Sequence, residues 1–185
     1  PAIYIGCQPP DKIDLMDEAL NIAKEVEQVV LMVGTNSDWE TEGNDRVDFN
    51  LPGKQNELIE KVIEINPNTI IVLNTGSPIN MPWVNKAKAV IQSWYAGQEY
   101  GNALVDILTG ATNPSGKLPT TYPANLSDTP AFESYPGKNL QMDYDEKLLV
   151  GYKWYDKNLI EPLFPFGHGL SYTEFEYSEL KIKKD

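Results

Sequence analysis

The chain has 185 residues, of which 41% are hydrophobic and 23% charged, a composition typical of one soluble globular domain with a sizeable core. Its net charge is −12, which argues against nucleic acid and an anionic membrane as partners, because both bind basic surfaces. No apolar run reaches the ~18 residues that a membrane span requires.

Residue types that bind metals are scarce. Cys7 is the only cysteine and His168 the only histidine, so an internal disulfide is excluded and a zinc site is disfavoured. The glycines do not predict a phosphate-binding loop, because no GxGxxG or GK[ST] sequence follows a predicted strand. We therefore expect no metal and no cofactor, and we expect a structural role for His168 in its glycine-flanked aromatic turn.

Helices and strands are predicted to alternate along the first half of the chain. Residues 13–27 place apolar side chains on one helical face, and 52–65 do the same with Pro52 near the first turn. Two short apolar runs, 28–33 and 69–73, lack polar alternation and predict buried strands.

A third strand and a third helix follow this alternation. The strand is predicted over 89–92 and the helix over 98–108, with Gly110 as its terminator. Apolar strands without alternation, separated by helices, are typical of a parallel sheet covered on both faces. The predicted fold class is therefore α/β, with a mostly parallel sheet sandwiched by helices in a flavodoxin-like α/β sandwich.

The sequence changes character from residue 112. Turn-forming residues and unpatterned segments up to 147 predict a long ordered excursion over the domain surface. Its aromatic side chains are expected to be buried, namely Tyr122, Phe132, Tyr135 and Tyr144. Strands are predicted over 148–155 and 171–182, and the alternation of the second predicts a new β domain. We therefore assign 1–170 to the α/β domain and 171–185 to the start of that β domain.

The most informative stretch follows the first predicted strand, which ends at Gly34. The loop after it combines carboxylates with an arginine and a tryptophan, namely Asp38, Trp39, Glu40, Glu42, Asp45, Arg46 and Asp48. Open α/β sheets carry their chemistry at the carboxyl ends of their strands, so this acidic loop is the candidate site. We expect Asp45 and Arg46 to form an ion pair that holds the loop.

Seven segments, in order and near the expected spacing, resemble the family 3 glycoside hydrolases (β-glucosidases and relatives). They are DWETEGNDR (38–46), NLPGKQNELI (50–59), NPNTIIVLNTGSP (66–78), MPW (81–83), IQSWYAGQEYGNALVDILTGATNPSGKLPTTYP (91–123), VGYKWYD (150–156) and PLFPFGHGLSYTEFEYS (162–178). The resemblance implies the second, α/β-sandwich domain of a family 3 β-glucosidase. It also implies that an N-terminal (β/α)8 barrel of the same polypeptide supplies the nucleophilic aspartate, and that 171–185 begin a fibronectin-III-like domain.

The resemblance also concerns the ends of the chain. The opening PAIYIGCQPP (1–10) is similar to the point at which the sandwich domain resumes after an inserted PA14 domain in one branch of the family. The chain has no initiating methionine, and we expect both of its ends to lie within a longer polypeptide.

The resemblance implies that this chain supplies the general acid/base of a retaining mechanism. Such a mechanism needs two carboxyl groups ~5–5.5 Å apart, a nucleophile and an acid that protonates the leaving oxygen and then activates water. Glu40 is the preferred acid/base, because it follows Trp39 and its distance past the strand end at Gly34 resembles that in family members with a short loop. Trp39 beside it could form an apolar wall that raises the pKa of its carboxyl group. Glu42 is the alternative, since other branches carry the catalytic glutamate in a differently shaped loop with an EG pair.

The expected activity is exo-acting hydrolysis of terminal non-reducing β-D-glucosyl residues. The partners implied are a β-glucoside or oligosaccharide substrate and the barrel domain, without which this fragment is expected to be inactive. A family 3 enzyme of other glycone specificity, such as a β-xylosidase, stays open. The alternative from another class is a non-catalytic α/β carbohydrate-binding or scaffold module, in which the loop carboxylates are solvated or structural.

Overall fold

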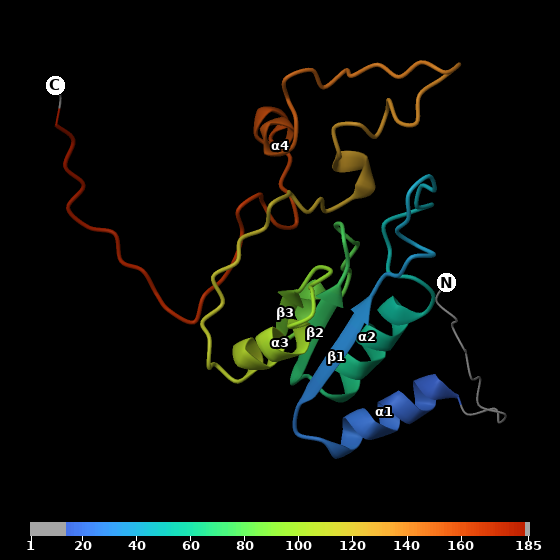
Figure 1. Cartoon of the computed structure of the whole chain (residues 1–185), viewed down its shortest axis with the longest axis vertical. Coiled ribbons are helices and arrows are strands. Elements are labelled where there is room, and N and C mark those ends of the chain that lie inside the picture. Colours follow the sequence, from blue (N-terminus) through green and yellow to red (C-terminus); the bar gives the residue numbers. More distant parts are fainter. Residues whose placement is uncertain (1–13, 184–185) are drawn as a thin grey trace. The chain divides into compact units, whose positions relative to one another are not determined.

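Residues 14–183 are described by the computed structural model and divide into two units (Figure 1). The first unit consists of 14–46, 50–76 and 81–94, and the second of 47–49, 77–80 and 95–183. The opening segment 1–10, for which resumption after a PA14 domain is predicted, lies outside the described residues. Within 14–183, no helix combines the length and the apolar character needed to cross a membrane.

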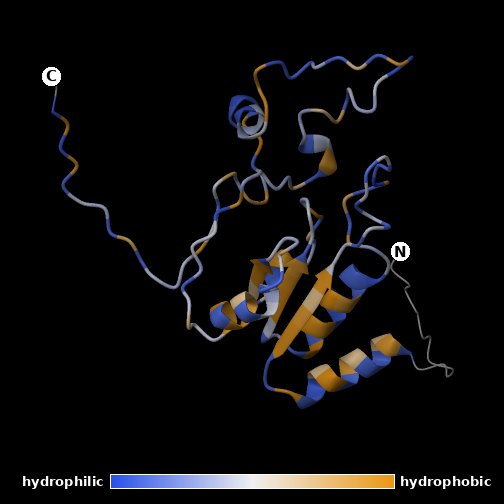
Figure 2. Ribbon diagram, viewed as in Figure 1, coloured by the Kyte–Doolittle hydropathy of each residue, from blue (hydrophilic) through white to orange (hydrophobic). Residues whose placement is uncertain are grey.

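The first unit contains a parallel sheet of three strands (Figure 1). They are β1 (Val29–Gly34), β2 (Thr69–Asn74) and β3 (Ala89–Gln92), in the spatial order β1-β2-β3. Val29 pairs with Thr69 and Ile70 with Ala89, so the carboxyl ends of all three strands lie at one edge. Each strand forms at a predicted apolar run, which Figure 2 shows as hydrophobic ribbon.

Three helical segments accompany this sheet in the first unit. They are α1 (Leu15–Glu25), α2 (Gln55–Ile65) and the 3₁₀-helix η1 (Val84–Lys86). α1 begins after Asp14, whose side chain accepts a hydrogen bond from the Met16 N–H at 2.9 Å. α2 begins three residues later than predicted because Gly53 has φ +60°, which is outside the helical region.

The core of the first unit lies between α2 and β2. Ile59, Val62 and Ile63 of the helix are buried, as are Ile71 and Val72 of the strand. Burying an aliphatic side chain of this size stabilises the folded state by ~1.5–3 kcal/mol. The pairing therefore holds β2 at the centre of the sheet.

α1 packs on α2, and Asn66 joins the ends of the two helices. Asn66 ends α2 as predicted, and its buried amide donates to the carbonyls of Ala23 and Val26 at 3.1 and 2.9 Å. The apolar face of α1 was predicted to point inward, but it is mostly exposed. Ala23 is buried, whereas Leu15 and Ile22 are 68% and 57% exposed.

The side chains of β1 differ in burial between its two faces. Val33 is 6% exposed, whereas Val30 and Met32 on the opposite face are 43% and 54% exposed. β1 is an edge strand of the described sheet, and α2 packs on its neighbour β2. The α/β class and the parallel pairing are confirmed, whereas coverage of both faces by helices stays a prediction.

The second unit has short helices joined by long irregular segments. Its helices are α3 (Tyr100–Leu108), the 3₁₀-helix η2 (Leu126–Asp128) and α4 (Tyr152–Asn158). Gly110 follows α3 with φ +76°, as predicted for a helix terminator. The backbones of Tyr122 and Phe164 exchange hydrogen bonds of 2.9 and 3.2 Å. The His168 ring lies 4.8 Å from the Phe164 ring, a packing contact that suits a structural histidine.

Two strands predicted for the second unit do not form. Within 148–155, Gly151 has φ +58° and α4 begins directly after it. Described residues 171–183 contain no strand, and at their start Asn113 Oδ1 accepts hydrogen bonds from the Tyr172 N–H and the Ser171 hydroxyl at 2.8 and 3.1 Å. Both strand predictions are wrong, while the assignment of 171–185 to a further domain stays a prediction.

Aromatic burial in the second unit also departs from the prediction. Tyr122 is 1% exposed, but Phe132, Tyr135 and Tyr144 are 43%, 51% and 72% exposed. The stretch from 129 to 147 contains no helix or strand that could pack over these rings. The predicted burial is therefore correct for Tyr122 and wrong for the other three side chains.

Candidate active site at the strand ends

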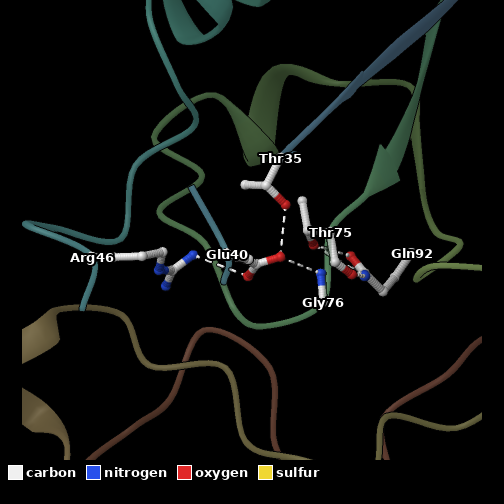
Figure 3. A network of polar contacts seen from close by, with 6 residues as sticks. All are labelled: Thr35, Glu40, Arg46, Thr75, Gly76 and Gln92. Atoms are coloured by element: carbon white, nitrogen blue, oxygen red, sulfur yellow. Dashed lines mark hydrogen bonds and ion pairs between the residues drawn. The ribbon is translucent and has the colours of Figure 1, made fainter. Parts of the chain in front are cut away.

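The carboxyl ends of the three strands are joined by hydrogen bonds (Figure 3). The N–H of Thr35, which follows β1, donates to the carbonyl of Asn74 at 3.1 Å. Gln92, at the end of β3, donates through Nε2 to the carbonyl and hydroxyl oxygens of Thr75 at 3.0 and 3.2 Å. Both threonines are buried. The strand ends thus form a buried, hydrogen-bonded base for the loops that follow them.

The acidic loop leaves the sheet at a point where β1 and β2 approach closely. A Cβ on Gly34 would lie 2.2 Å from the carbonyl oxygen of Asn74, so only glycine fits there. The Gln55 side chain accepts from the Gly34 N–H at 2.8 Å and donates to the Gly34 carbonyl at 2.9 Å. The first residue of α2 therefore holds the end of β1.

Glu40 connects the acidic loop to two strand ends (Figure 3). Its Oε2 accepts hydrogen bonds from the Thr35 hydroxyl and from the Gly76 N–H, both at 2.8 Å. Its Oε1 lies 3.5 Å from Arg46 Nη1. The side chains of Glu40 and Arg46 are 14% and 19% exposed, so this ion pair is largely shielded from solvent. These donors stabilise a negatively charged carboxylate.

The predicted ion pair between Asp45 and Arg46 does not form. Arg46 contacts Glu40 instead, and Asp45 is exposed. The loop returns toward Glu40 near its end, which places the guanidinium beside that carboxylate. The arginine therefore holds the loop as expected, but through a different acid.

Glu42 lies in the turn at the tip of the acidic loop. Thr41 and Asn44 form an antiparallel bridge, and Gly43 between them has φ +80°. A four-residue turn with a positive φ at its third residue favours glycine there. Glu42 is the second residue of that turn and is exposed. Its carboxyl group can therefore meet a molecule that approaches from outside the domain.

Two tryptophans follow strands of this sheet, Trp39 in the acidic loop and Trp94 after β3. The Trp39 N–H donates to the Asn36 carbonyl at 3.0 Å, and its indole N–H is buried with no hydrogen-bond partner within the described residues. Trp94 follows β3 and has φ +56°, an uncommon conformation for a bulky residue. Strained residues of this kind are frequent at functional sites.

The structure brings Glu40 and Glu42 into one loop but in different environments. Sequence reasoning missed Thr35 and Gly76 as the partners of Glu40, since 36 residues separate Gly76 from Glu40. The Thr75-Gly76 pair directly after β2 was the one feature of the sequence that could have indicated a backbone donor at this strand end. Within 14–183, no three His, Cys, Asp or Glu side chains are grouped so as to hold a metal ion.

Sequence comparison relates the chain to β-glucosidases. The probable beta-glucosidase I of Emericella nidulans is 46% identical over 169 residues, which are 91% of this chain and 20% of that protein. The thermostable beta-glucosidase B of Acetivibrio thermocellus is 46% identical over 171 residues, covering 92% of this chain and 23% of that protein. The chain thus spans about a fifth of the length of these relatives.

Structural comparison gives the same relationship. The beta-glucosidase of Kluyveromyces marxianus in complex with glucose matches with a TM-score of 0.87 and 42% identity, over 92% of this chain and 20% of that one. The beta-glucosidase of Streptomyces venezuelae in complex with D-glucose matches with a TM-score of 0.78 and 44% identity, over 86% of this chain and 20% of that one.

The family profile covers both described units. The glycosyl hydrolase family 3 C-terminal domain matches residues 12–172, which include the strands, the acidic loop and every described helix. With the parallel sheet, the acidic loop at its carboxyl edge and the sequence identity to known relatives, this match shows that the chain belongs to glycosyl hydrolase family 3, as its C-terminal domain.

Proposed function

We propose that this chain is the acid/base-bearing domain of a retaining β-glucosidase that hydrolyses terminal non-reducing β-D-glucosyl residues. The observation that supports it most is the acidic loop at the carboxyl edge of a parallel sheet in a chain of this family. Relatives named as beta-glucosidases and similar structures in complex with glucose support the choice of glucose.

The proposed reaction divides its two carboxyl groups between domains. An aspartate of an N-terminal barrel domain attacks the anomeric carbon, while an acid of the acidic loop gives its proton to the leaving oxygen. The resulting carboxylate then takes a proton from the water that hydrolyses the glycosyl–enzyme intermediate, which restores both groups. No cofactor is needed in this scheme.

Glu42 and Glu40 are the two candidates for this acid, and the local contacts favour Glu42. An acid must hold a proton and reach the leaving oxygen. Glu42 is exposed at the tip of a turn, whereas the Oε atoms of Glu40 face Thr35, Gly76 and Arg46. Both carboxylate oxygens of Glu40 already contact donors of its own unit, whereas an acid must present its proton to the substrate.

The test compares variants of the full-length protein on substrates that need different amounts of acid assistance. Cellobiose has a poor leaving group, and 2,4-dinitrophenyl β-glucoside has a leaving group that departs without a proton. We expect Glu42→Ala to lower kcat/KM for cellobiose by ~10²–10⁴-fold, and to lower glycosylation by the dinitrophenyl substrate far less. Asp45→Asn, which removes a carboxylate from the same loop, is the matched control and keeps wild-type rates.

Several results would contradict the proposal. A full-length protein that hydrolyses no β-glucoside, or releases the α-anomer first, is not a retaining β-glucosidase. A faster reaction on an aryl β-xyloside than on the glucoside would assign a different glycone. If neither Glu42→Ala nor Glu40→Ala changes the rate on cellobiose, the chain is a carbohydrate-binding or scaffold module instead.

A further inference from the structure

The carboxylate of Glu40 has several contacts within its own unit. One carboxylate oxygen accepts from the Thr35 hydroxyl and the Gly76 N–H at 2.8 Å each, and the other lies 3.5 Å from Arg46 Nη1. Thr35 follows β1 directly and Gly76 lies two residues after β2. A single side chain therefore fixes the loop to the ends of two neighbouring strands.

The same side chain also closes the base of the turn that presents Glu42. Thr41 and Asn44 pair across the turn, so Glu40 precedes the pair on one side and Arg46 follows it on the other. The contact between Glu40 and Arg46 thus joins the two arms of the loop just below its tip. The conformation of Gly43, with φ +80°, sets the direction of the tip itself.

The burial of this ion pair indicates what its loss would do. The two side chains are only 14% and 19% exposed, and breaking one partner of a shielded pair leaves the other charge poorly solvated. Two other acidic side chains of the loop, Asp38 and Asp45, are exposed. The Glu40–Arg46 pair is therefore one support of the turn that carries Glu42, beside the bridge between Thr41 and Asn44.

We infer that Glu40 is a positioning residue, which holds the turn at 41–44 to the ends of β1 and β2 and so directs Glu42 toward the leaving group. This inference rests on the proposed function and deepens it. Glu40 then orients the turn, and Glu42 exchanges the proton with the substrate. A misplacement of ~1 Å at a reacting group can lower a rate by ~10²-fold, so an orienting residue has a measurable kinetic effect.

The two roles give different kinetic signatures. Loss of a general acid affects poor leaving groups most, removes one limb of the pH–rate profile, and is no better tolerated as glutamine than as alanine. Loss of a positioning residue lowers the rate on both kinds of substrate by a similar factor and keeps the pH limbs. Glutamine at 40 can still accept from Thr35 and Gly76 through its amide oxygen, so it restores part of the rate.

The experiment uses full-length protein with Glu40→Ala, Glu40→Gln, Thr35→Val and Glu42→Ala. We expect Glu40→Ala to lower kcat about 10- to 100-fold on cellobiose and on 2,4-dinitrophenyl β-glucoside alike, with an unchanged pH profile and no rescue by azide. Glu40→Gln should recover part of this loss. Thr35→Val should act in the same direction with a smaller effect, because it removes one of the donors to Glu40.

Hydrogen exchange of residues 36–46 gives a readout independent of catalysis. We expect faster exchange in Glu40→Ala and Thr35→Val, and wild-type exchange in Glu42→Ala, with residues 55–65 of α2 as the internal control for folding. Equal inactivity of Glu40→Gln and Glu40→Ala, with azide rescue, would make Glu40 the acid/base and overturn the inference. Wild-type exchange of the loop in Glu40→Ala would overturn it too.

Failure of the inference can be told apart from failure of the proposed function. If the wild-type protein hydrolyses no β-glucoside, the proposed function fails, and the exchange data alone decide whether Glu40 holds the loop. If wild type is active but loop exchange is unchanged in Glu40→Ala, the function stands and the positioning role is excluded.

Discussion

Two glutamates separated by one residue have different environments in this chain. Glu40 is largely shielded and faces three donors, whereas Glu42 is exposed in a turn. A carboxyl group's environment decides whether it works as an acid or remains ionised. The choice between neighbouring acids in a loop therefore depends on the partners of each, which come here from Thr35, Arg46 and Gly76.

The buried phenol of Tyr155 makes the stability of the second unit depend on pH. It is 5% exposed on α4, and burial followed by the negative charge of Asp128 raises the pKa of its phenol above 10.0. A raised pKa means that the folded state favours the neutral phenol, so its stabilising contribution is complete below ~10 and is lost as the pH rises further. We expect heat inactivation of the full-length protein to accelerate above pH ~10, and Tyr155→Phe to reduce this acceleration.

The measurement compares inactivation rates of wild type and Tyr155→Phe from pH 7 to 11. Tyr172→Phe is a suitable control, since Tyr172 is 61% exposed and its removal leaves the buried phenol in place. Identical pH dependence of wild type and Tyr155→Phe would contradict the assignment of alkaline sensitivity to this phenol.

At the scale of elements, β1, β2 and α2 together support the acidic loop. Gly34 permits the close approach of β1 to β2, and Gln55 at the start of α2 bonds both backbone groups of Gly34. α2 in turn buries Ile59 against the sheet. The position of the loop is thus set by packing in the core as well as by its own contacts.

Gly34→Ala tests this arrangement. The added Cβ would lie 2.2 Å from the Asn74 carbonyl oxygen, so β1 must shift and weaken its pairing with β2. We expect a loss of about 1–3 kcal/mol in local stability, seen as roughly tenfold or greater acceleration of hydrogen exchange in β1 and β2 of the full-length protein. Gly97→Ala is the matched control, because a Cβ there has no atom within 4 Å. Equal exchange in the two variants would show that the close approach is unimportant.

At the scale of the whole molecule, the chain spans about a fifth of the length of its β-glucosidase relatives. A retaining mechanism needs a nucleophile as well as an acid, and we propose that the nucleophile belongs to another domain of the same polypeptide. Residues 1–185 alone are therefore expected to hydrolyse no aryl β-glucoside, while the full-length protein is active. Hydrolysis by this chain at a rate near that of the full-length protein would contradict the division of the site between domains.

Much of the first unit was predictable from the sequence. Continuous apolar runs identify β1, β2 and β3, and α2 ends at Ile65, the last residue of the predicted helix. These features depend on local spacing and backbone preference, which a sequence displays directly. The acidic loop could be placed at the strand ends for the same reason.

Other features depend on contacts that local sequence does not show. The strand predicted over 148–155 fails because Gly151 takes φ +58° before a helix, and no strand forms over described residues 171–182, where the Tyr172 N–H donates to a distant side chain, Asn113. The partners of Glu40 lie on two different strand ends, so they follow only from the strand order. The exposure of Phe132 likewise depends on which segments pack on its ring, and the sequence around it does not show this.

The most direct test of the central claim is the product formed by full-length Glu42→Ala with 2,4-dinitrophenyl β-glucoside and azide. This substrate forms the glycosyl–enzyme intermediate without an acid, and azide attacks that intermediate without a base. We predict β-glucosyl azide from Glu42→Ala, with an accelerated turnover, and none from Glu40→Ala. β-Glucosyl azide from Glu40→Ala alone, or from neither variant, would contradict the assignment of the acid/base to Glu42.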